Sequence, residues 1–363
     1  MSENQTNILQ QLGWDADFER HFQSVAFTGC MPGRVASDNR QLYQLFTGKG
    51  VLRARLPGKL QRQAGEDGHY PVVGDWAAFI PAPGEEGGMI QSVLPRKTWF
   101  SRQAAGGKTK EQVVAANIDT VFIVGALDEG RSTNARRFER YLTLVWSSGA
   151  NPVIVLNKSD LCSDIEDYIR RIEPAVAGVP VHAVSAMQRA GLDTLQFYIP
   201  PGKTAALLGP SGVGKSALIN ALIGEERQAT GAVRDRDRTG KHTTSARELL
   251  LVPGGGVVID TPGMREIQMW AGEADLAGAF EDIVALAREC QFKDCKHTGE
   301  PGCAVKAAIE TGALDAGRLE SFEKLQREVR FHTARQRGNE RQLERERWKK
   351  VSQWQKRYRR DEQ

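Results

Sequence analysis

The chain has 363 residues, of which 40% are hydrophobic and 26% charged, with a formal net charge of +4 at pH 7. These values are typical of a soluble globular protein, and the length allows two or three domains with a buried core. No apolar run approaches the ~20 residues that a membrane-spanning helix needs, so we expect no membrane segment.

Residues 1–29 are expected to form an N-terminal extension that is amphipathic or loosely ordered. The opening MSENQTNILQQLGW is polar and lacks the apolar core of a signal peptide. We therefore expect a cytoplasmic protein, in which the five cysteines do not form disulfides.

Short alternating segments with glycine and proline turns fill residues 30–100. Their spacing predicts a small β-barrel, and the basic residues Arg53, Arg55, Lys59 and Arg62 favour an oligonucleotide-binding (OB) fold. A generic small β-domain is the alternative. The polar stretch from Ser101 to Gln112 is predicted to be a linker.

Residues 113–270 alternate between apolar, strand-like runs and helical stretches. Examples of the runs are TVFIVGAL, NPVIVLNK, VPVHAVSA, KTAALLG and GVVIDTPG. Such alternation predicts an α/β domain with a mainly parallel sheet covered by helices on both faces.

Two motifs in the first half of this domain are typical of guanine recognition. In NKSD, Asp160 is expected to accept hydrogen bonds from N1–H and the amine of guanine, which adenine cannot supply. Asn157 would brace the loop and the Lys158 stem would lie against the base. In the VSAM that follows the next strand, Ser185 would order the turn and the Ala186 amide would reach guanine O6. Read alone, NKSD also fits an ordinary loop with an Asp N-cap.

The segment GPSGVGKS fits the phosphate-loop pattern between a strand and an apolar helix. Gly209, Gly212 and Gly214 allow the backbone N–H groups to turn toward phosphate oxygens. Lys215 supplies a charge to the β- and γ-phosphates, and the Ser216 hydroxyl is expected to coordinate Mg²⁺. The other predicted contacts of the loop are Pro210, Ser211, Val213 and Ala217.

The residues that sense the γ-phosphate are predicted in two later segments. In DTPG, Asp260 is a water-mediated partner of Mg²⁺ and the Gly263 N–H bonds the γ-phosphate. Residues 233–245 resemble a switch loop, in which Thr243 or, as we favour, Thr244 completes the magnesium shell. Met264 stands where many GTPases carry a water-orienting Gln. We expect His242 to take that role, with a solvent-exposed loop histidine as the alternative.

These motifs stand in an unusual order, because NKSD precedes the phosphate loop by about fifty residues instead of following it. A mononucleotide site is built from loops at the carboxyl ends of parallel strands, so the loops can occur in any chain order if the fold is preserved. The sequence therefore predicts a circularly permuted GTPase.

Residues 271–363 are predicted to be a helical, metal-binding domain with a basic tail. Cys290, Cys295, His297 and Cys303 supply three thiolates and an imidazole, which suit a closed, structural Zn²⁺ site. Chance clustering of buried cysteines is the alternative. From Arg327 onward there are thirteen Lys or Arg against six Asp or Glu. This tail is either an arm for polyanions or a solvated helix of mixed charge.

Taken together, these residues resemble the circularly permuted, small-ribosomal-subunit-dependent GTPase family of the RsgA type. The resemblance spans residues 30–330 and includes VVGDW (72–76), LPRKTWFSR (94–102), AANID (115–119), GKHTT (240–244) and the Cys/His cluster. It implies an OB barrel, a permuted GTPase centre, a zinc domain, and a role in late assembly of the small ribosomal subunit. It further implies contact with ribosomal RNA and faster GTP hydrolysis on the subunit.

The expected partners are GTP or GDP, the small ribosomal subunit with its RNA, and other assembly factors bound there; we expect a monomer. Two other functions remain open at this point. One is an RNA-binding scaffold with a static nucleotide, which Met264 favours. The other is an ATP-dependent kinase or transferase, which NKSD disfavours.

Overall fold

The computed structural model describes most of the chain as two compact units. One unit comprises residues 1–102 and 112–268, and the other comprises 103–111 and 269–363. The residues whose structure is described are 3–25, 28–39, 42–67, 70–82, 87–103, 111–128, 135–176, 178–225, 247–260, 276–278 and 280–330. The domain boundaries expected from the sequence stay a prediction.

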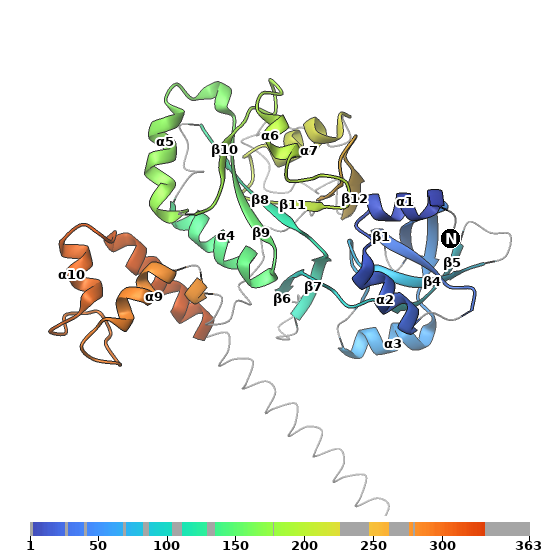
Figure 1. The fold of residues 1–363 in the computed structure, drawn as a ribbon, viewed down its shortest axis with the longest axis horizontal. Coiled ribbons are helices and arrows are strands. Elements are labelled where there is room, and N and C mark those ends of the chain that lie inside the picture. The colour runs from blue at the N-terminus through green and yellow to red at the C-terminus, as the bar shows by residue number, and fades with distance from the viewer. Residues whose placement is uncertain are drawn as a thin grey trace, which may run out of the picture. The chain divides into compact units, whose positions relative to one another are not determined.

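Five strands near the N-terminus close into a small barrel (Figure 1). They are β1 (Met31–Asn39), β2 (Leu42–Thr47), β3 (Gly50–Arg55), β4 (Trp76–Pro81) and β5 (Gly87–Val93). The order is β1-β2-β3-β5-β4, and β4 pairs back onto β1; only the β3–β5 pair is parallel. Alternate residues such as Tyr43, Leu45 and Phe79 fill the interior. The predicted OB-like barrel is confirmed.

The barrel carries a helix that the sequence analysis did not predict, α3 (Gly58–Asp67), between β3 and β4. The predicted polar linker at 101–112 is partly wrong, because β6 (Trp99–Gln103) and β7 (Glu111–Ala116) enter it from both sides and pair with each other. Strand pairing uses backbone groups, so polar side chains did not prevent it.

The nucleotide-motif region forms a largely parallel sheet. Its strands are β8 (Thr120–Ala126), β9 (Asn151–Asn157), β10 (Val181–Ala183), β11 (Thr204–Leu208), β12 (Glu248–Leu251) and β13 (Val257–Asp260). They are arranged β10-β9-β8-β11-β13-β12, and all neighbours are parallel except β12 with β13. Each apolar run singled out in the sequence forms one of these strands, which confirms the predicted α/β fold.

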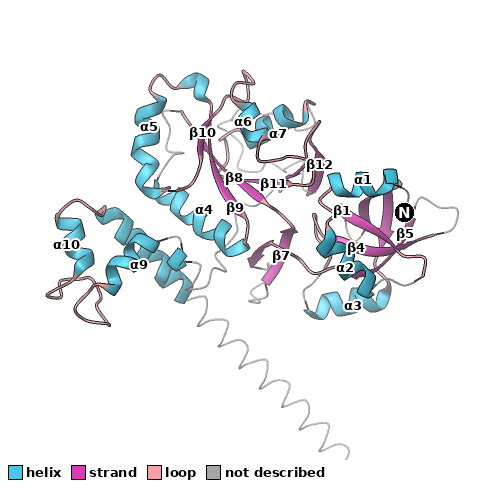
Figure 2. Cartoon of the chain, in the orientation of Figure 1, coloured by secondary structure: helices cyan, strands magenta, loops and turns pink. Residues whose placement is uncertain are grey.

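Helices cover both faces of this sheet (Figure 2). The even-numbered residues of β8, such as Phe122 and Val124, join one core cluster with α6 (Leu192–Gln196) and α7 (Lys215–Ile223). The alternate residues Val121 and Ile123 are also fully buried. The helix α4 (Ala135–Ser148) packs against β8 and β9, followed in the chain by α5 (Ile165–Ile172).

Arg34 on β1 joins the barrel to the parallel sheet. Its side chain is 1% exposed, and burial lowers the pKa of its guanidinium to about 10, so it stays charged at pH 7. Nε donates to the Gly74 carbonyl at 3.2 Å, and Nη1 donates to the Leu12 carbonyl. Nη2 donates to the Asn117 carbonyl at 2.9 Å and to Thr204 Oγ1 at 2.8 Å. One side chain therefore contacts the N-terminal extension, the barrel and strand β11.

The N-terminal extension is ordered as two helices, α1 (Glu3–Gln11) and α2 (Ala16–Val25). Trp14 between them lies edge-on to the fully buried Trp76 of β4, with ring centroids 4.7 Å apart. The Gly202 N–H just before β11 donates to the Gln11 carbonyl at 2.9 Å. The extension thus packs against both the barrel and the parallel sheet.

Helices joined by loops make up residues 280–330 of the C-terminal unit. It contains α9 (Glu281–Arg288), α10 (Ala304–Glu310) and a helix over residues 316–330. The Arg318 guanidinium lies 4.8 Å from the Phe280 ring and Nε donates to Asp282 at 2.6 Å. Within the described ranges, no helix is long and apolar enough to cross a membrane. The basic tail beyond residue 330 lies outside them.

Replacing Arg34 by Met should lower the free energy of unfolding by about 3 kcal/mol, because several buried acceptors lose their donor. Urea unfolding followed by circular dichroism would measure this. The matched control is Arg53→Met, since Arg53 is exposed on β3. A loss below about 1 kcal/mol, or an equal loss in the control, would contradict the role of Arg34.

Candidate nucleotide site and metal centre

Five strand ends meet at one edge of the parallel sheet. Strands β10, β9, β8, β11 and β13 run in the same direction, so the loops after them lie along a common edge. The five strands end at residues 183, 157, 126, 208 and 260, in that spatial order. The guanine-type and phosphate-type motifs therefore lie at the same edge despite their order in the chain.

The phosphate loop depends on glycines for two separate reasons. Gly212 and Gly214 have φ values of 84° and 90°, a backbone conformation that favours glycine. A Cβ on Gly209 would come 2.4 Å from the Val124 carbonyl, and one on Gly214 would come 2.2 Å from Asn157 Nδ2. The loop thus sits directly against β8 and the NKSD segment.

Helix α7 begins at Lys215, immediately after the loop, with Ser216 and Ala217 in its first turn. The Lys215 ammonium donates to the Gly209 and Pro210 carbonyls at 2.8 and 2.6 Å. The lysine therefore reaches back across the loop that contains Ser211 and Val213. A helix N-terminus and a cation at a glycine-rich loop together form a site for an anion such as a phosphate.

Asn157 connects the phosphate loop to both base-reading segments. Its side chain is 2% exposed, Nδ2 donates to the Val213 carbonyl at 2.9 Å, and Oδ1 accepts the Ala186 N–H at 3.0 Å. The bracing role expected of Asn157 thus has two identified partners. The Ala186 amide, predicted to reach guanine O6, donates to Asn157 here, so its contact with a base stays a prediction.

A hydroxyl–carboxylate hydrogen bond orders the two base-reading turns relative to each other. The Ser185 hydroxyl donates to Asp160 Oδ1 and accepts the Gln188 N–H, the latter at 3.1 Å. The backbone groups of Ser185 and Ala190 exchange two further hydrogen bonds of 3.0 Å. Asp160 is therefore presented from an ordered pair of turns.

The sequence analysis missed Asp128, which follows β8 and lies beside the NKSD turn. Lys158 has a left-handed backbone, with φ of 65°, and its ammonium contacts Asp128 Oδ2 at 2.8 Å. Both side chains are about 30% exposed, at 28% and 31%. An acidic residue at the end of the strand neighbouring NKSD was the available signal.

Several predicted site residues lie outside the described part of the chain. They are His242, Thr243, Thr244, Gly263 and Met264. Asp260 is described and ends β13 at the site edge.

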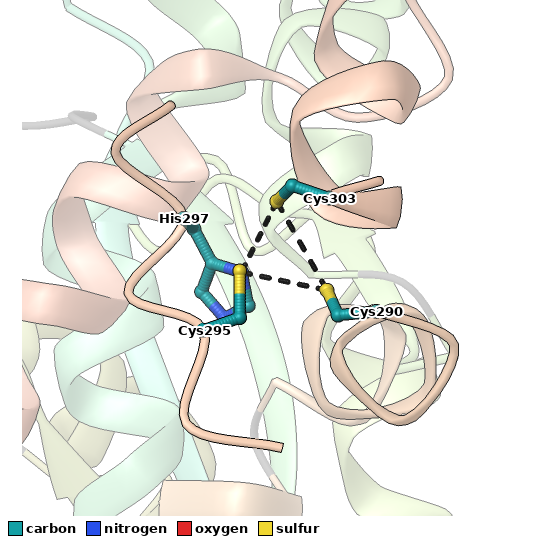
Figure 3. A group of neighbouring side chains, drawn as sticks. All are labelled: Cys290, Cys295, His297 and Cys303. Atoms are coloured by element: carbon teal, nitrogen blue, oxygen red, sulfur yellow. Dashed lines mark hydrogen bonds between the residues drawn. The ribbon is translucent and has the colours of Figure 1, made fainter. Parts of the chain in front are cut away.

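The four predicted metal ligands come together in the C-terminal unit (Figure 3). The ligand atoms of Cys290, Cys295, His297 and Cys303 all lie within 4.8 Å of one another. His297 Nδ1 is 3.4 Å from Cys303 Sγ and 3.7 Å from Cys290 Sγ, and the two sulfurs are 4.0 Å apart. Tetrahedral zinc with bonds of about 2.0 to 2.3 Å separates its ligand atoms by roughly 3.5 to 3.8 Å. The arrangement fits such a site.

Glu300 holds the loop that presents His297. Its carboxylate accepts the backbone N–H groups of Lys296, Thr298 and Gly299 at 2.9 to 3.0 Å. These bonds lower the pKa of Glu300 to about 2, so the carboxylate stays ionised well into the acid range. His297 itself has a left-handed backbone with φ of 60°, which the loop must maintain.

Comparisons with known proteins agree on one family. Residues 93–270 match the model of the RsgA GTPase. A relative from Opitutus terrae is 44% identical over 96% of this chain and 97% of its own length, and one from Methanosarcina acetivorans is 43% identical over 96% and 92%. Both carry the name small ribosomal subunit biogenesis GTPase RsgA.

Two solved structures share the fold. YjeQ from Thermotoga maritima is 28% identical, with a TM-score of 0.62 over 83% of this chain and 98% of its own. YloQ, described as a circularly permuted GTPase, is 23% identical, with a TM-score of 0.61 over 84% and 96%, and supports the fold alone.

Replacing Asn157 by Ala should weaken GDP binding by on the order of tenfold to a hundredfold, because two buried backbone groups lose their partner. Titration with a fluorescent GDP would measure the change. Asn151→Ala is the matched control, because Asn151 is exposed at the other end of the same strand. Equal affinities in the two variants would show that the bridge through Asn157 is unimportant.

In protein loaded with Zn²⁺, replacing Glu300 by Ala should speed the loss of the metal to a chelator, because three N–H groups of the ligand loop lose their acceptor. The rate of zinc loss from Glu300→Gln should lie between those of wild type and Glu300→Ala, since an amide oxygen is a weaker acceptor than a carboxylate. Glu310→Ala, an exposed change at the end of α10, serves as control. Unchanged zinc retention in Glu300→Ala would disprove the role of this carboxylate.

Proposed function

The chain belongs to the RsgA GTPase family, and on this basis we propose that it is a GTP-hydrolysing factor in biogenesis of the small ribosomal subunit. Its substrate is GTP and its product is GDP. It acts in the cytoplasm, at a late stage in the maturation of the subunit. The structural observation that supports a nucleotide substrate is the Asn157 side chain, which bonds the phosphate loop and a base-reading turn at once. Such a site suits a ligand with both a base and phosphates.

In this proposal the base lies at the turns that carry Asp160 and Ser185, and the phosphates lie at residues 209–217. Asp160 selects guanine through the hydrogen bonds that adenine cannot make. The Lys158 stem flanks the base, and the ion pair with Asp128 supports that placement. Lys215 neutralises phosphate charge in the ground state and as negative charge develops during transfer.

Magnesium bound with GTP supplies charge neutralisation at the β- and γ-phosphates. We assign its ligands to Ser216 and Thr244, with Thr243 as the alternative and Asp260 acting through water. The position of Asp260 at the end of β13, beside β11, supports its assignment. Gly263 would donate to the γ-phosphate, and His242 would orient the attacking water where Met264 cannot.

Zinc is the metal we assign to the Cys290, Cys295, His297 and Cys303 centre. Three thiolates and one imidazole complete a tetrahedral set and leave no position for a reacting water, so the role is structural. We propose four segments for the chain: an extension (1–29), the barrel (30–100), the permuted GTPase domain (113–270) and the zinc domain with its basic tail (271–363).

Contact with ribosomal RNA is proposed for the barrel and the C-terminal segment. The exposed cations Arg53, Arg55, Lys59 and Arg62 on β3 and α3 support this for the barrel. Binding that rests on such cations weakens steeply as salt is added. We further propose that the monomer holds the subunit in its GTP form, beside other assembly factors, and leaves it as GDP. Loss of the γ-phosphate contact at Gly263 would trigger that release.

Adding purified small subunits should increase the rate of GTP turnover. In His242→Ala this stimulation should be about a hundredfold smaller, while the affinity for GDP is retained. Phosphate release with and without subunits measures both effects. Absence of stimulation would contradict the ribosomal role. Full stimulation of the variant would instead remove His242 from the mechanism and leave the role intact.

A further inference from the structure

We propose that Arg189 is a positioning residue of the nucleotide site, which ties a base-reading turn to the far end of the phosphate-loop helix α7. The inference rests on the proposed function, because it assumes that the ligand is a guanosine phosphate. Arg189 belongs to none of the nucleotide motifs. It lies three residues after Ala186, and the contact that singles it out is made to a part of α7 remote from the phosphate loop.

The turn that carries Arg189 is closed and ordered. Ser185 and Ala190 are joined by two backbone hydrogen bonds of 3.0 Å, and the Gln188 N–H donates to the Ser185 hydroxyl. Arg189 itself has φ of 56°, a left-handed conformation that is uncommon for a residue with a long side chain. The turn therefore fixes the backbone from which the Arg189 side chain extends.

The Arg189 side chain ends at the C-terminus of α7. Nη2 donates to the Ala221 carbonyl at 3.0 Å. Ala221 is in the last turn of the helix, where carbonyl groups lack helical partners, while the next-door Asn220 carbonyl accepts the Gly224 N–H. A cation at a helix C-terminus also interacts favourably with the helix dipole.

Two contacts from the base-reading half therefore hold α7, one at each end. Asn157 bonds the Val213 carbonyl just before the helix, and Arg189 bonds Ala221 near its end. A nine-residue helix is about 13 Å long. Core packing sets the general orientation of α7, and these two contacts, one helix length apart, add a direct link from the base-reading half to each end of the helix. Helix α6, which follows the Arg189 turn, packs beside α7 (Figure 1).

The tilt of α7 matters to a ligand that spans the site. The N-terminus of α7 faces the phosphates, and the turns at Asp160 and Ser185 face the base. GDP bridges both halves and gains affinity when they are held at the correct spacing, because less order has to be imposed on binding. Guanosine touches only the base-reading half, so its affinity should not depend on the tilt of α7.

The test compares Arg189→Met with wild type in competition against a fluorescent GDP, with GDP and guanosine as competitors. GDP should bind roughly threefold to fivefold more weakly to the variant, the effect expected for losing a cation at a helix C-terminus. Guanosine should bind unchanged. Arg189→Lys, which keeps a cationic donor, should recover part of the lost affinity for GDP. Arg170→Met is the matched control, because Arg170 is exposed on α5 and contacts Asp167.

Unchanged GDP affinity in Arg189→Met would overturn the proposal, as would an equal loss for GDP and guanosine, which would indicate damage to the base-reading turn alone. If Arg189→Met fails to fold, the Arg189→Lys variant decides: it must bind GDP more weakly than wild type and guanosine equally well, and unchanged GDP affinity in this variant would overturn the proposal. ADP as a third competitor tests the proposed function separately from the role of Arg189. Wild-type protein that prefers ADP would contradict the proposed function, whatever Arg189 does.

Discussion

The nucleotide site depends on one buried carboxamide that serves two loops. The Asn157 side chain donates to the phosphate loop and accepts from the turn after β10, and no apolar side chain of similar size can do either. The position of the Asn157 side chain also requires a glycine at residue 214, where a Cβ would collide with the Asn157 amide. The site is therefore defined by the backbone groups that Asn157 bonds at the sheet edge, and not by the order of the motifs in the chain.

Sequence patterns were sufficient for the features that are local. The phosphate loop and NKSD each follow an apolar strand, and parallel strands must place such loops at one edge. The four metal ligands lie within fourteen residues, so a short loop was enough to gather them. The family resemblance and the α/β and OB-like folds are confirmed for the same reason: each follows from motifs or periodicity within single segments.

Contacts between distant segments were beyond the reach of these patterns. Arg34 meets Thr204 across 170 residues, and its neighbours MPGRVASDN give no sign that it is buried. Asp128 and Arg189 belong to no motif. Their roles can be inferred only from the groups that the fold places beside them, Lys158 and the Ala221 carbonyl. The helix α3 was missed because GKLQRQAGED contains two glycines and follows a proline, a composition that suggests a turn.

Among the described residues, the sheet of the nucleotide site continues into the barrel through one bridge, Ser37 to Glu248, between β1 and β12. Strand β12 is the outermost of its own sheet, and Leu251 on it is 55% exposed. An apolar strand at an open sheet border is a template on which a second chain can add its own strand. Here β12 has β13 on one side and β1 of the barrel on the other. The barrel thus covers part of a strand edge that would otherwise be open to another chain.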